Sequence, residues 1–540
     1  MEQQISRGTQ SRPQRPWVAL GVLAAGLGLV VLDGTIVSVA LPQIIEDIGL
    51  SLTDAQWVNS LYAVILAALL LSTGKLADRF GRKKLFIIGV LVFATGSLVA
   101  AGAGTAGALL GARAIQAVGA SCIMPSTLSS VNAMFQGKQR AAAFGIWGAV
   151  ISGAAAIGPL AGGLLTQYAS WHWIFLVNLP LGALLLVLAI IYVPESKGGR
   201  PLPGADVDGA MLSAIGMGAL VFAIIQGPQV GWFTPTADFA LAGWIWPSSA
   251  PISLVFVSLI VAAVALTLFV RWELHREKVG RSALLDLNLF HIGSFSWGNL
   301  TATTVAIGEF ALLFVLPLYL VNALGMSVLG AGVVLAAMAV GAFGSGAAAR
   351  HLAARLGSAG TVLLGLGLEV IGVLALTGLI RGNTPGWLIA IALVVYGIGL
   401  GLASAQLTGA VLASVPVEIS GQGSATQSTV RQIGSALGTA VSGAVLSAAL
   451  AITLPAQLAD HGIPESKATQ LAEATTQSAG TTITQLRVRG DSASTIDALS
   501  AGFAQATQLA MLVAAVFLLL GVLGAWQLRR LHQLHETSTR

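Results

Sequence analysis

Long apolar runs, each followed by a short polar segment, recur along the whole 540-residue chain. A run of about 20 apolar residues can cross the hydrocarbon core of a bilayer as an α-helix. We count fourteen runs of this kind and predict that each is a membrane-spanning helix. The predicted spans are 17–41, 57–77, 84–104, 107–131, 141–167, 173–193, 208–227, 251–271, 294–320, 327–350, 360–380, 387–415, 424–454 and 504–528.

The composition agrees with an all-α integral membrane protein. Of all residues, 55% are hydrophobic and only 9% are charged, whereas soluble domains carry about 25% charged residues. The single cysteine, Cys122, excludes a disulfide within the chain and a cluster of thiolate metal ligands. The sequence has no GxxxxGK[ST] phosphate-binding loop, so we do not expect ATP to supply energy through this chain. No metal or organic cofactor is predicted.

The basic residues are distributed unevenly between alternate polar segments. Fourteen spans place both ends of the chain on one side of the membrane, and with the N-terminus inside, 21 of the 27 lysines and arginines fall on the cytoplasmic side. The other six are Arg381, Lys467, Arg487 and Arg489 outside, and Arg113 and Arg431 within spans. Because lysine and arginine are enriched in cytoplasmic loops, we predict a multi-pass protein of the cytoplasmic membrane with both termini inside. This distribution explains the net charge of +5 without a nucleic-acid partner.

Two polar segments on the predicted outer side are long. Residues 455–503 are rich in Ala, Thr, Gln and Ser, and they form either a hairpin or helices over the outer mouth or a solvated loop. The other segment carries Trp232, Trp244 and Trp246. We expect these side chains at the membrane interface, where tryptophan is enriched.

A weak internal repeat relates two loops on the predicted cytoplasmic side. Residues 74–84 read GKLADRFGRKK, and residues 350–357 read RHLAARLG. Four positions match at a constant offset of 276 residues: Leu76, Ala77, Arg79 and Gly81 match Leu352, Ala353, Arg355 and Gly357. Symmetry of this kind is typical of transporters built from two halves related about an axis along the membrane normal. Asp78 has no acidic counterpart, because Ala354 stands in its place.

The repeat divides the chain into two halves of six spans. The region between the halves then holds the two remaining spans, the seventh and the eighth. The predicted parts are a cytoplasmic tail at 1–16, a first half at 17–193, a linker with the extra spans at 194–291, a second half at 292–528 with the outer segment 455–503, and a cytoplasmic tail at 529–540.

Asp33 is an acidic residue inside the first apolar run. A charge at the centre of a spanning helix costs at least ~2.5–3.5 kcal/mol on insertion scales, so an acid there is a functional candidate. Burial among apolar helices penalises the ionised carboxyl, so Asp33 can exchange a proton and can also pair with a cationic substrate. Competition between proton and cation for one site is the simplest chemistry for antiport. The alternative is a structural acid bonded to a hydroxyl such as that of Thr35.

Further ionisable residues fall within predicted spans. Arg113 in the fourth span stays charged when buried and needs a partner, so it can act on a neighbouring carboxylate. Gln116 lies one turn further on and can share its hydrogen bonds. Glu309 lies near the middle of the ninth span, and Glu369 is equally deep in the eleventh.

Six segments together carry the pattern of a known family. They are Leu32–Pro42, Gly74–Lys84, Arg113–Ala120, Gly158–Gly163, Trp171–Gly182 and Val415–Gly438. In this order they resemble the motifs of the major facilitator superfamily, and in particular of its fourteen-span drug:proton antiporter branch. Ala117 and Ala154 stand where the family usually has glycine, and His172 stands where it usually has arginine. The resemblance implies the major facilitator fold, with two pseudo-symmetric six-helix halves and two inserted helices.

The resemblance also implies roles for individual residues. It makes Arg113 part of the proton relay, with structural pairing as the alternative. It places Glu309 on a cavity-lining helix that faces the first span, which favours a role in binding protons or substrate. The eleventh span corresponds to a peripheral helix, so we interpret Glu369 as a protonated or locally paired structural residue.

The loop motif after the second span is interpreted as a conformational latch. Its residues are Asp78, Arg79, Gly81 and Arg82. An acid there can cap the N-terminus of a neighbouring helix, and breaking that contact lets the halves rock.

The fifth span carries a face of small residues, with a proline that disturbs its backbone hydrogen bonds. The residues of this motif are Gly158, Pro159, Gly162 and Gly163. Such residues are tolerated in membrane helices when neighbouring helices satisfy the backbone. We expect a hinge and a tight seal between the halves, with generic helix packing as the alternative.

The sequence therefore predicts a proton-coupled antiporter, not an enzyme, that exports lipophilic, cationic small molecules by alternating access. Its expected partners are these substrates, protons and membrane lipids, and it is expected to act as a monomer. One alternative is a dedicated exporter of an endogenous metabolite or lipid. Another is a sensor without flux or a membrane enzyme, although His172 is the only histidine near a candidate lumen.

Overall fold

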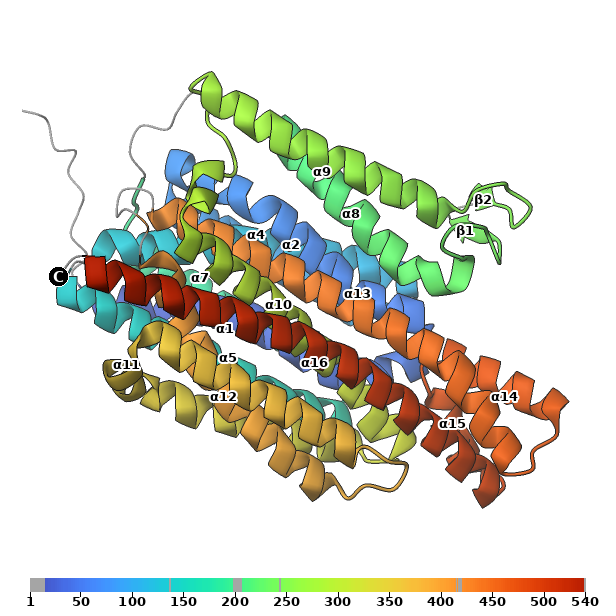
Figure 1. Cartoon of the computed structure of the whole chain (residues 1–540). Helices are drawn as coiled ribbons and strands as arrows, with labels where there is room; N and C mark the ends of the chain where they lie inside the picture. Colours follow the sequence, from blue (N-terminus) through green and yellow to red (C-terminus); the bar gives the residue numbers. More distant parts are fainter. Residues whose placement is uncertain are drawn as a thin grey trace, which may run out of the picture.

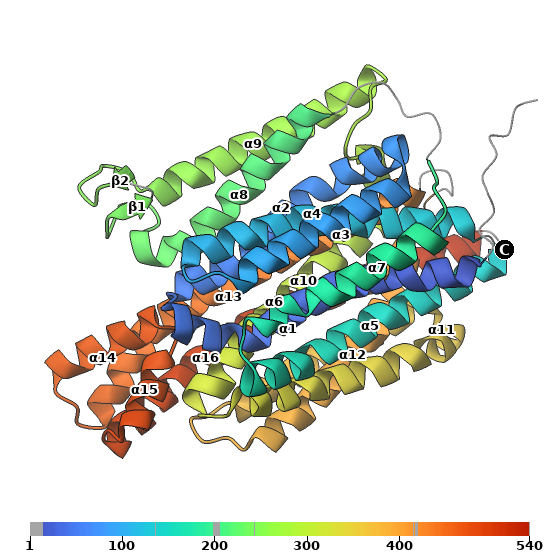
Figure 2. The same ribbon diagram turned by 180° about the vertical axis from the view of Figure 1, so that it is seen from behind.

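Long α-helices packed side by side make up most of the chain in the computed structural model (Figure 1, Figure 2). The structure describes residues 15–135, 137–197, 206–241, 244–413, 415 and 420–538. The predicted tail at 1–16 lies outside these residues except for its last two positions, and so do the final two residues of the tail at 529–540.

Residues 16–192 form the helices of the first predicted half, within the described residues. Pro16 stands in the first turn of α1, where a missing N–H costs nothing, and Gly49 ends the helix with a left-handed φ of 71°. A capping box between Ser51 and Asp54 starts α2. The helices are α1 (Pro16–Ile48), α2 (Leu52–Phe80), α3 (Arg82–Ala101), α4 (Ala106–Met134), α5 (Gly137–Tyr168), α6 (Trp173–Leu176) and α7 (Asn178–Tyr192).

The two additional helices form a hairpin beside the bundle. They are α8 (Val207–Val230) and α9 (Leu254–Lys278), followed by the 3-10 helix η1 (Leu287–His291). Figure 1 and Figure 2 show α8 between α9 and the bundle. The hairpin is attached to α2 at both ends, because Lys75 Nζ donates to Ser282 Oγ at 2.8 Å and Gln229 Nε2 donates to Thr53 Oγ1.

A small antiparallel sheet joins α8 to α9. Its strands are β1 (Phe239–Leu241) and β2 (Trp244–Trp246), with Phe239 opposite Trp246. The prediction of a wholly α-helical chain did not anticipate these strands. Three residues are too few to produce a recognisable alternation of apolar and polar positions, which is the sequence signal of a strand.

The second predicted half contains the longest helices of the chain. Helices also form the polar segment 455–503, so among the alternatives for this segment the structure has helices and not a solvated loop. In Figure 1 α14 and α15 extend beyond the bundle, at the end opposite the C-terminus. The elements are α10 (Gly293–Leu318), the π-helix η2 (Tyr319–Ala323), α11 (Val328–Leu379), α12 (Gly386–Leu412), α13 (Ser420–Asp460), α14 (Glu465–Gln477), α15 (Thr481–Arg489) and α16 (Ala493–Ser538).

Twelve helices of the described part of the chain are long and apolar enough to cross a membrane. This number is two fewer than the fourteen predicted spans. One of the twelve is the 52-residue α11, which joins two predicted spans across a break at Gly357. The 32-residue α5, which covers the predicted span 141–167, is not among the twelve.

The internal repeat is visible in the backbone. Gly81 separates α2 from α3 with φ of 120° and ψ of 131°. Gly357, its partner in the repeat, interrupts α11 with φ of 74° and ψ of 164°. Only glycine adopts such angles without strain, so both loops need glycine at the same position. The repeated glycine therefore marks a helix break in each half.

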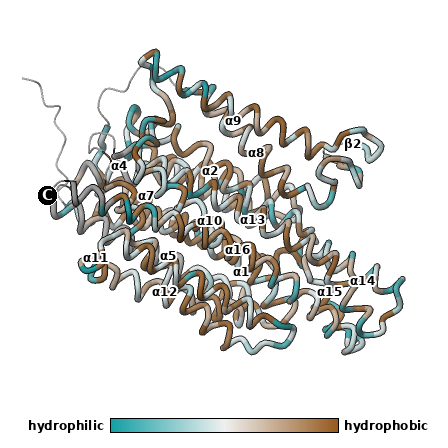
Figure 3. Tube along the Cα trace, viewed as in Figure 1, coloured by the Kyte–Doolittle hydropathy of each residue, from teal (hydrophilic) through white to brown (hydrophobic). Residues whose placement is uncertain are grey.

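The most extensive packing between the two predicted halves is made by two pairs of helices. α5 packs against α11, and α2 packs against α13. The largest group of buried apolar side chains extends across this junction, from Ile36 in α1 to Leu312 in α10 and Leu518 in α16. Figure 3 shows apolar residues along the length of the bundle and polar residues mainly at its two ends and on α14 and α15. This distribution is expected when lipid, and not water, surrounds the middle of the bundle.

We predict that Gly81→Ala destabilises the fold. An added Cβ would lie 2.6 Å from Glu195 Oε1, and the φ of 120° disfavours any L-residue. Strain of this kind costs about 1–3 kcal/mol. The melting temperature of the purified protein in detergent should fall. Gly107→Ala is the control, because a Cβ at Gly107 in α4 meets no atom within 4 Å. Equal melting temperatures for the two variants would contradict the prediction.

Candidate functional site

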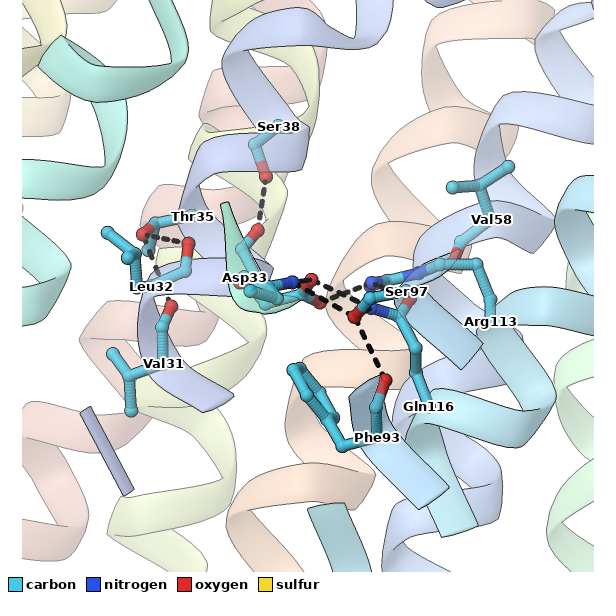
Figure 4. Close-up of polar contacts among 12 residues, drawn as sticks. Val31, Leu32, Asp33, Thr35, Ser38, Val58, Phe93, Ser97, Arg113 and Gln116 are labelled. Carbon is cyan, nitrogen blue, oxygen red and sulfur yellow. Dashed lines mark hydrogen bonds and ion pairs between the residues drawn. The ribbon is translucent and has the colours of Figure 1, made fainter. Parts of the chain in front are cut away.

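Asp33 lies in the middle of α1 and is completely buried. Its Oδ2 forms an ion pair with Nη1 of Arg113 in α4, whose side chain is 1% exposed. Figure 4 shows these two side chains pointing toward one another across the gap between their helices. A buried ion pair is retained only where hydrogen bonds satisfy the remaining polar atoms of both groups.

Two side-chain amides complete the shell around the Asp33 carboxylate. Nε2 of Gln116 and Nδ2 of Asn178 each donate to Asp33 Oδ1 at 2.9 Å. The same two amides donate to Ser97 Oγ, at 2.8 and 3.1 Å respectively. Ser97 in turn donates to the carbonyl oxygen of Phe93 at 2.9 Å. One hydrogen-bonded network therefore joins residues of α1, α3, α4 and α7. Figure 4 shows Asp33, Ser97, Arg113 and Gln116 of this network.

Arg113 is held on its other sides as well. Its Nε donates to the carbonyl oxygen of Val58 in α2 at 3.3 Å, and its Nη1 donates to Gln116 Oε1 at 3.0 Å. The guanidinium carbon lies 4.2 Å from the centre of the Tyr62 ring. A planar guanidinium suits this site, because it pairs with a carboxylate and stacks on an aromatic ring at once. The Tyr62 hydroxyl and Asn178 Oδ1 are buried without a hydrogen-bond partner among the described residues.

Glycines let the helices of this site approach closely. An added Cβ at Gly96 in α3 would lie 2.6 Å from the backbone nitrogen of Gln116. An added Cβ at Gly119 in α4 would lie 2.4 Å from the backbone nitrogen of Phe93. Small residues at helix crossings allow this kind of packing in membranes. The close crossing of α3 and α4 brings Ser97 and Gln116 within hydrogen-bonding distance.

The prediction that apolar helices alone surround the Asp33 carboxyl is wrong. Its contacts are polar, and they come from α4 and α7, which a view of the first span alone cannot show. The hydroxyl alternative is also wrong, because Thr35 donates to the carbonyl oxygens of Val31 and Leu32 in its own helix. The predicted contact between Arg113 and Gln116 is confirmed. Asn178 and Ser97 also belong to the site, and neither was predicted as a site residue. Asn178 is the one amide side chain within the Trp171–Gly182 motif, and this position in an apolar segment could have indicated a polar contact.

A second ion pair lies in the other predicted half. Nη2 of Arg431 in α13 lies 3.1 Å from Oε2 of Glu309 in α10. The side chains are 45% and 12% exposed respectively, so this pair is more open than the first. No hydrogen bond or ion pair among the described residues joins Glu309 to Asp33. The structure thus gives each of the two predicted acids its own arginine.

Two of the predicted latch residues, Asp78 and Arg82, contact one another. Asp78 forms an ion pair with Arg82 at 2.8 Å, one turn away. The acid that accepts from the first turn of α3 is Glu195, whose Oε1 accepts from the backbone N–H of Lys83 at 3.2 Å. The expectation that Asp78 caps a neighbouring helix is therefore wrong in this conformation. Glu195 follows the sixth span in the sequence, so its return to this loop was not evident.

The small-residue face of α5 packs against two helices. An added Cβ at Gly162 would lie 2.8 Å from the carbonyl oxygen of Ile36 in α1. One at Gly163 would lie 3.1 Å from the Cα of Leu329 in α11, and Gly158 is tighter still against Thr35. The carbonyl oxygen of Pro159 lies against Gly332 of α11. This face therefore joins α1, beside Asp33, to the other half.

Comparisons with known proteins find relatives along most of the chain. The profile of the Major Facilitator Superfamily matches residues 23–439. The chain is 33% identical to the multidrug resistance protein Stp of Mycobacterium tuberculosis, over 83% of this chain and 79% of the relative. It is also 33% identical to the multidrug efflux pump LfrA of Mycolicibacterium smegmatis, over 82% of each chain.

Other similarities extend to an antibiotic exporter and to a solved structure. The chain is 29% identical to the tetracenomycin C resistance and export protein of Streptomyces glaucescens, over 83% of this chain and 79% of the relative. A crystal structure of a bacterial homologue of the human lysosomal transporter Spinster has a TM-score of 0.60, with 17% identity. The match covers 97% of this chain and 98% of the other. At this identity the match shows the fold alone.

We predict that Arg113 and Asp33 are coupled in stability. Arg113→Gln leaves the Asp33 carboxylate buried without its cation, and breaking a buried pair in this way costs about 3–5 kcal/mol. Adding Asp33→Asn removes the stranded charge, so the double variant should be more stable than Arg113→Gln alone. Melting temperatures of the purified single and double variants test this. Losses that simply add would show that the two charges do not stabilise one another.

Proposed function

Because the chain belongs to the Major Facilitator Superfamily, we propose that it is a proton-coupled antiporter that exports lipophilic, cationic compounds across the cytoplasmic membrane. It is a transporter and not an enzyme, and its relatives include the multidrug resistance protein Stp and the multidrug efflux pump LfrA, each 33% identical to it. The observation that carries the proposal is the buried pair of Asp33 and Arg113.

The chemistry of this pair supports exchange of a proton for a cation. The Asp33 carboxylate accepts from Arg113, Gln116 and Asn178, and each of these contacts is a positive or hydrogen-donating group. A proton or a cationic substrate offers the same carboxylate an alternative partner, and each excludes the other by charge. Arg113 can retreat without leaving a polar environment, because Tyr62 and the Val58 carbonyl already contact it.

In the proposed transport cycle, each step changes the partner of the Asp33 carboxylate. A cationic substrate that enters from the cytoplasm pairs with Asp33 and displaces Arg113. After the halves rock, a proton from outside neutralises Asp33, and the substrate loses its counter-charge and leaves. Release of that proton to the cytoplasm restores the ion pair. The proton is thus the coupling ion, no cofactor takes part, and a monomer is sufficient because the site lies within one half.

We propose that the chain crosses the membrane fourteen times. Counting each side of Gly357 in α11 as a span, and adding α5, raises the twelve candidate helices to fourteen. Both termini are then cytoplasmic. The end of the bundle with α14 and α15 becomes the outer side, and it carries few basic residues, as the charge rule requires.

The contacts between the halves support a structure closed on the outer side. Gly163 and Pro159 meet α11 near the outer end of α5. Ser60 Oγ donates to the carbonyl oxygen of Ala436 at 3.3 Å, in the outer half of α2. We propose that the small-residue face of α5 seals the halves on this side. We propose that the pair of Asp78 and Arg82 is part of a conformational latch on the cytoplasmic side.

A second candidate function is export of one endogenous metabolite. The relative named as a tetracenomycin C resistance and export protein favours it, because that name combines resistance with export of a single compound. Transport of one compound and failure to transport a panel of lipophilic cations would support this candidate.

We predict that Asp33→Asn abolishes proton-coupled transport and leaves the protein folded. Asparagine keeps the size of the side chain but cannot exchange a proton. In proteoliposomes with an acidic lumen, the wild-type protein should accumulate a lipophilic cation such as tetraphenylphosphonium, and the variant should not. Accumulation by the variant at the wild-type level would refute the role of Asp33.

Asp238→Asn is the matched control. Asp238 lies in the exposed segment between α8 and β1, where hydrogen bonds from Ser248 hold the pKa of its carboxyl below the usual range. This carboxyl is therefore ionised throughout the pH range of the assay, so the control removes one negative charge far from the site. It should transport like the wild type.

A further inference from the structure

An apolar groove, the α1–α7 groove, lies between two helices that pack side by side in the first predicted half (Figure 2). Its volume is about 380 Å³, within the range of about 300–1,000 Å³ that is usual for small-molecule sites. All of its lining residues are apolar, and they include Gly21, Ala25 and Leu29 of α1 and Leu181, Leu184 and Leu188 of α7.

The α1–α7 groove is open along one side. The side chains of Leu181 and Leu184 are 36% and 55% exposed, and a Cβ added at Gly21 would meet no atom within 4 Å. Both helices are apolar enough to cross a membrane, so this open side faces lipid. In the proposed orientation α1 begins at the cytoplasmic side, which places the groove in the cytoplasmic leaflet. A molecule dissolved in that leaflet can therefore enter the groove without passing through water.

The inner end of the groove lies one helical turn from the Asp33 site. Leu29 precedes Asp33 by four residues in α1, and Leu181 follows Asn178 by three residues in α7. Residues with these spacings lie on the same face of a helix. Asn178 Nδ2 donates to Asp33 Oδ1 at 2.9 Å and thereby joins the two helices at this level. The apolar stripe on each helix thus continues into a polar residue of the site.

The polar atoms at this end of the groove suit a cation. Arg113 pairs with Oδ2 of Asp33, whereas Oδ1 accepts from the neutral amides of Gln116 and Asn178. The other polar atom of the Asn178 side chain, Oδ1, is buried and has no hydrogen-bond partner among the described residues. An amide oxygen and a carboxylate oxygen both attract positive charge. A cation that arrives along the groove therefore meets the carboxylate oxygen with which Arg113 does not pair.

The order of apolar and polar groups argues against a bilayer lipid as the occupant. A lipid of the cytoplasmic leaflet has its polar head at the membrane surface and the end of its chain near the centre. The groove has the reverse order, because it is apolar from Gly21 to Leu29 and polar at Asp33, in the middle of α1. The end of a lipid chain would leave these buried polar atoms unsatisfied. A cation with an apolar tail matches both ends of the groove.

We propose that the α1–α7 groove is the subsite that holds the apolar part of the transported cation. The charged group lies at Oδ1 of Asp33, and the tail extends along α1 toward Gly21. The cation first replaces the hydrogen bond from Asn178, and Arg113 is displaced afterwards. This inference rests on the proposed antiport function and adds selection to it. Asp33 selects substrates by charge, and the groove selects them by the length of their apolar part.

The experiment uses two cations with the same charged group and tails of different length. Ala25 lies eight residues from Asp33, about 12 Å along the helix. The tail of butyltrimethylammonium is too short to reach Ala25, whereas the tail of dodecyltrimethylammonium extends past it. An aromatic ring at position 25 leans over the preceding turn, where Gly21 leaves open space. Ala25→Phe therefore fills the groove beyond the reach of the short tail.

Dissociation constants of both cations are measured for wild-type protein and Ala25→Phe in lipid nanodiscs. The variant should bind dodecyltrimethylammonium about tenfold more weakly, because each methylene removed from an apolar site costs ~0.8 kcal/mol. Its dissociation constant for butyltrimethylammonium should equal that of the wild type. Partitioning of each cation into lipid cancels in the ratio of variant to wild type.

Ala263→Phe is the matched control. Ala263 is exposed in α9, and it lies eight residues from the cytoplasmic end of its predicted span, as Ala25 does. This control should bind both cations like the wild type. Leu184→Ala keeps the test decisive if Ala25→Phe does not fold, because it truncates an exposed side chain that lines the groove. It should weaken binding of the long cation about threefold and leave the short one unchanged.

Two results would overturn the proposed subsite while antiport stands. One is that the groove variants leave both dissociation constants unchanged. The other is that they raise both equally, which would show that the groove holds a bilayer lipid or only supports the fold. Proton-driven accumulation of tetraphenylphosphonium by the wild-type protein is measured in parallel. If that accumulation does not occur, the proposed function itself is overturned.

Discussion

The cost of a charge inside the membrane governs this molecule. Asp33 and Arg113 compensate each other's charge inside the bundle, and the amides of Gln116 and Asn178 donate to the second oxygen of the Asp33 carboxylate. Four helices must hold their register for these contacts to form at once, and glycines at their crossings permit it. Under the proposed function, the same requirement makes the site respond to a proton or a cation. Any proton or cation that occupies the carboxylate changes the balance that holds the helices together.

The two predicted halves differ in how they surround their buried acids with other polar groups. The first half encloses one acid with one arginine and buries both almost completely. The second half leaves Glu309 and Arg431 partly exposed and keeps a further acid, Glu369, in the interior. The backbone repeat at Gly81 and Gly357 shows that the halves share their helix breaks. Their polar residues differ, so the backbone repeat does not extend to the ionisable side chains.

Much of the architecture could be predicted because a bilayer imposes simple rules. Every predicted span overlaps a helix, and the repeated loop correctly located two helix breaks. What the sequence could not reveal was which distant side chains meet. Asn178 reaches Asp33 from α7, and Glu195 returns to the loop before α3, because tertiary packing and not periodicity brings them there. The short strands β1 and β2 were missed because they are too brief to leave a pattern.

Competition at Asp33 can be measured directly by equilibrium binding. The dissociation constant of purified wild-type protein for tetraphenylphosphonium is determined across a range of pH, with Asp33→Asn beside it. If protons and cations compete for this carboxylate, affinity weakens as the pH falls, approaching about tenfold per pH unit, and the variant shows no such dependence. A wild-type affinity that stays constant over the whole range would contradict competition at Asp33.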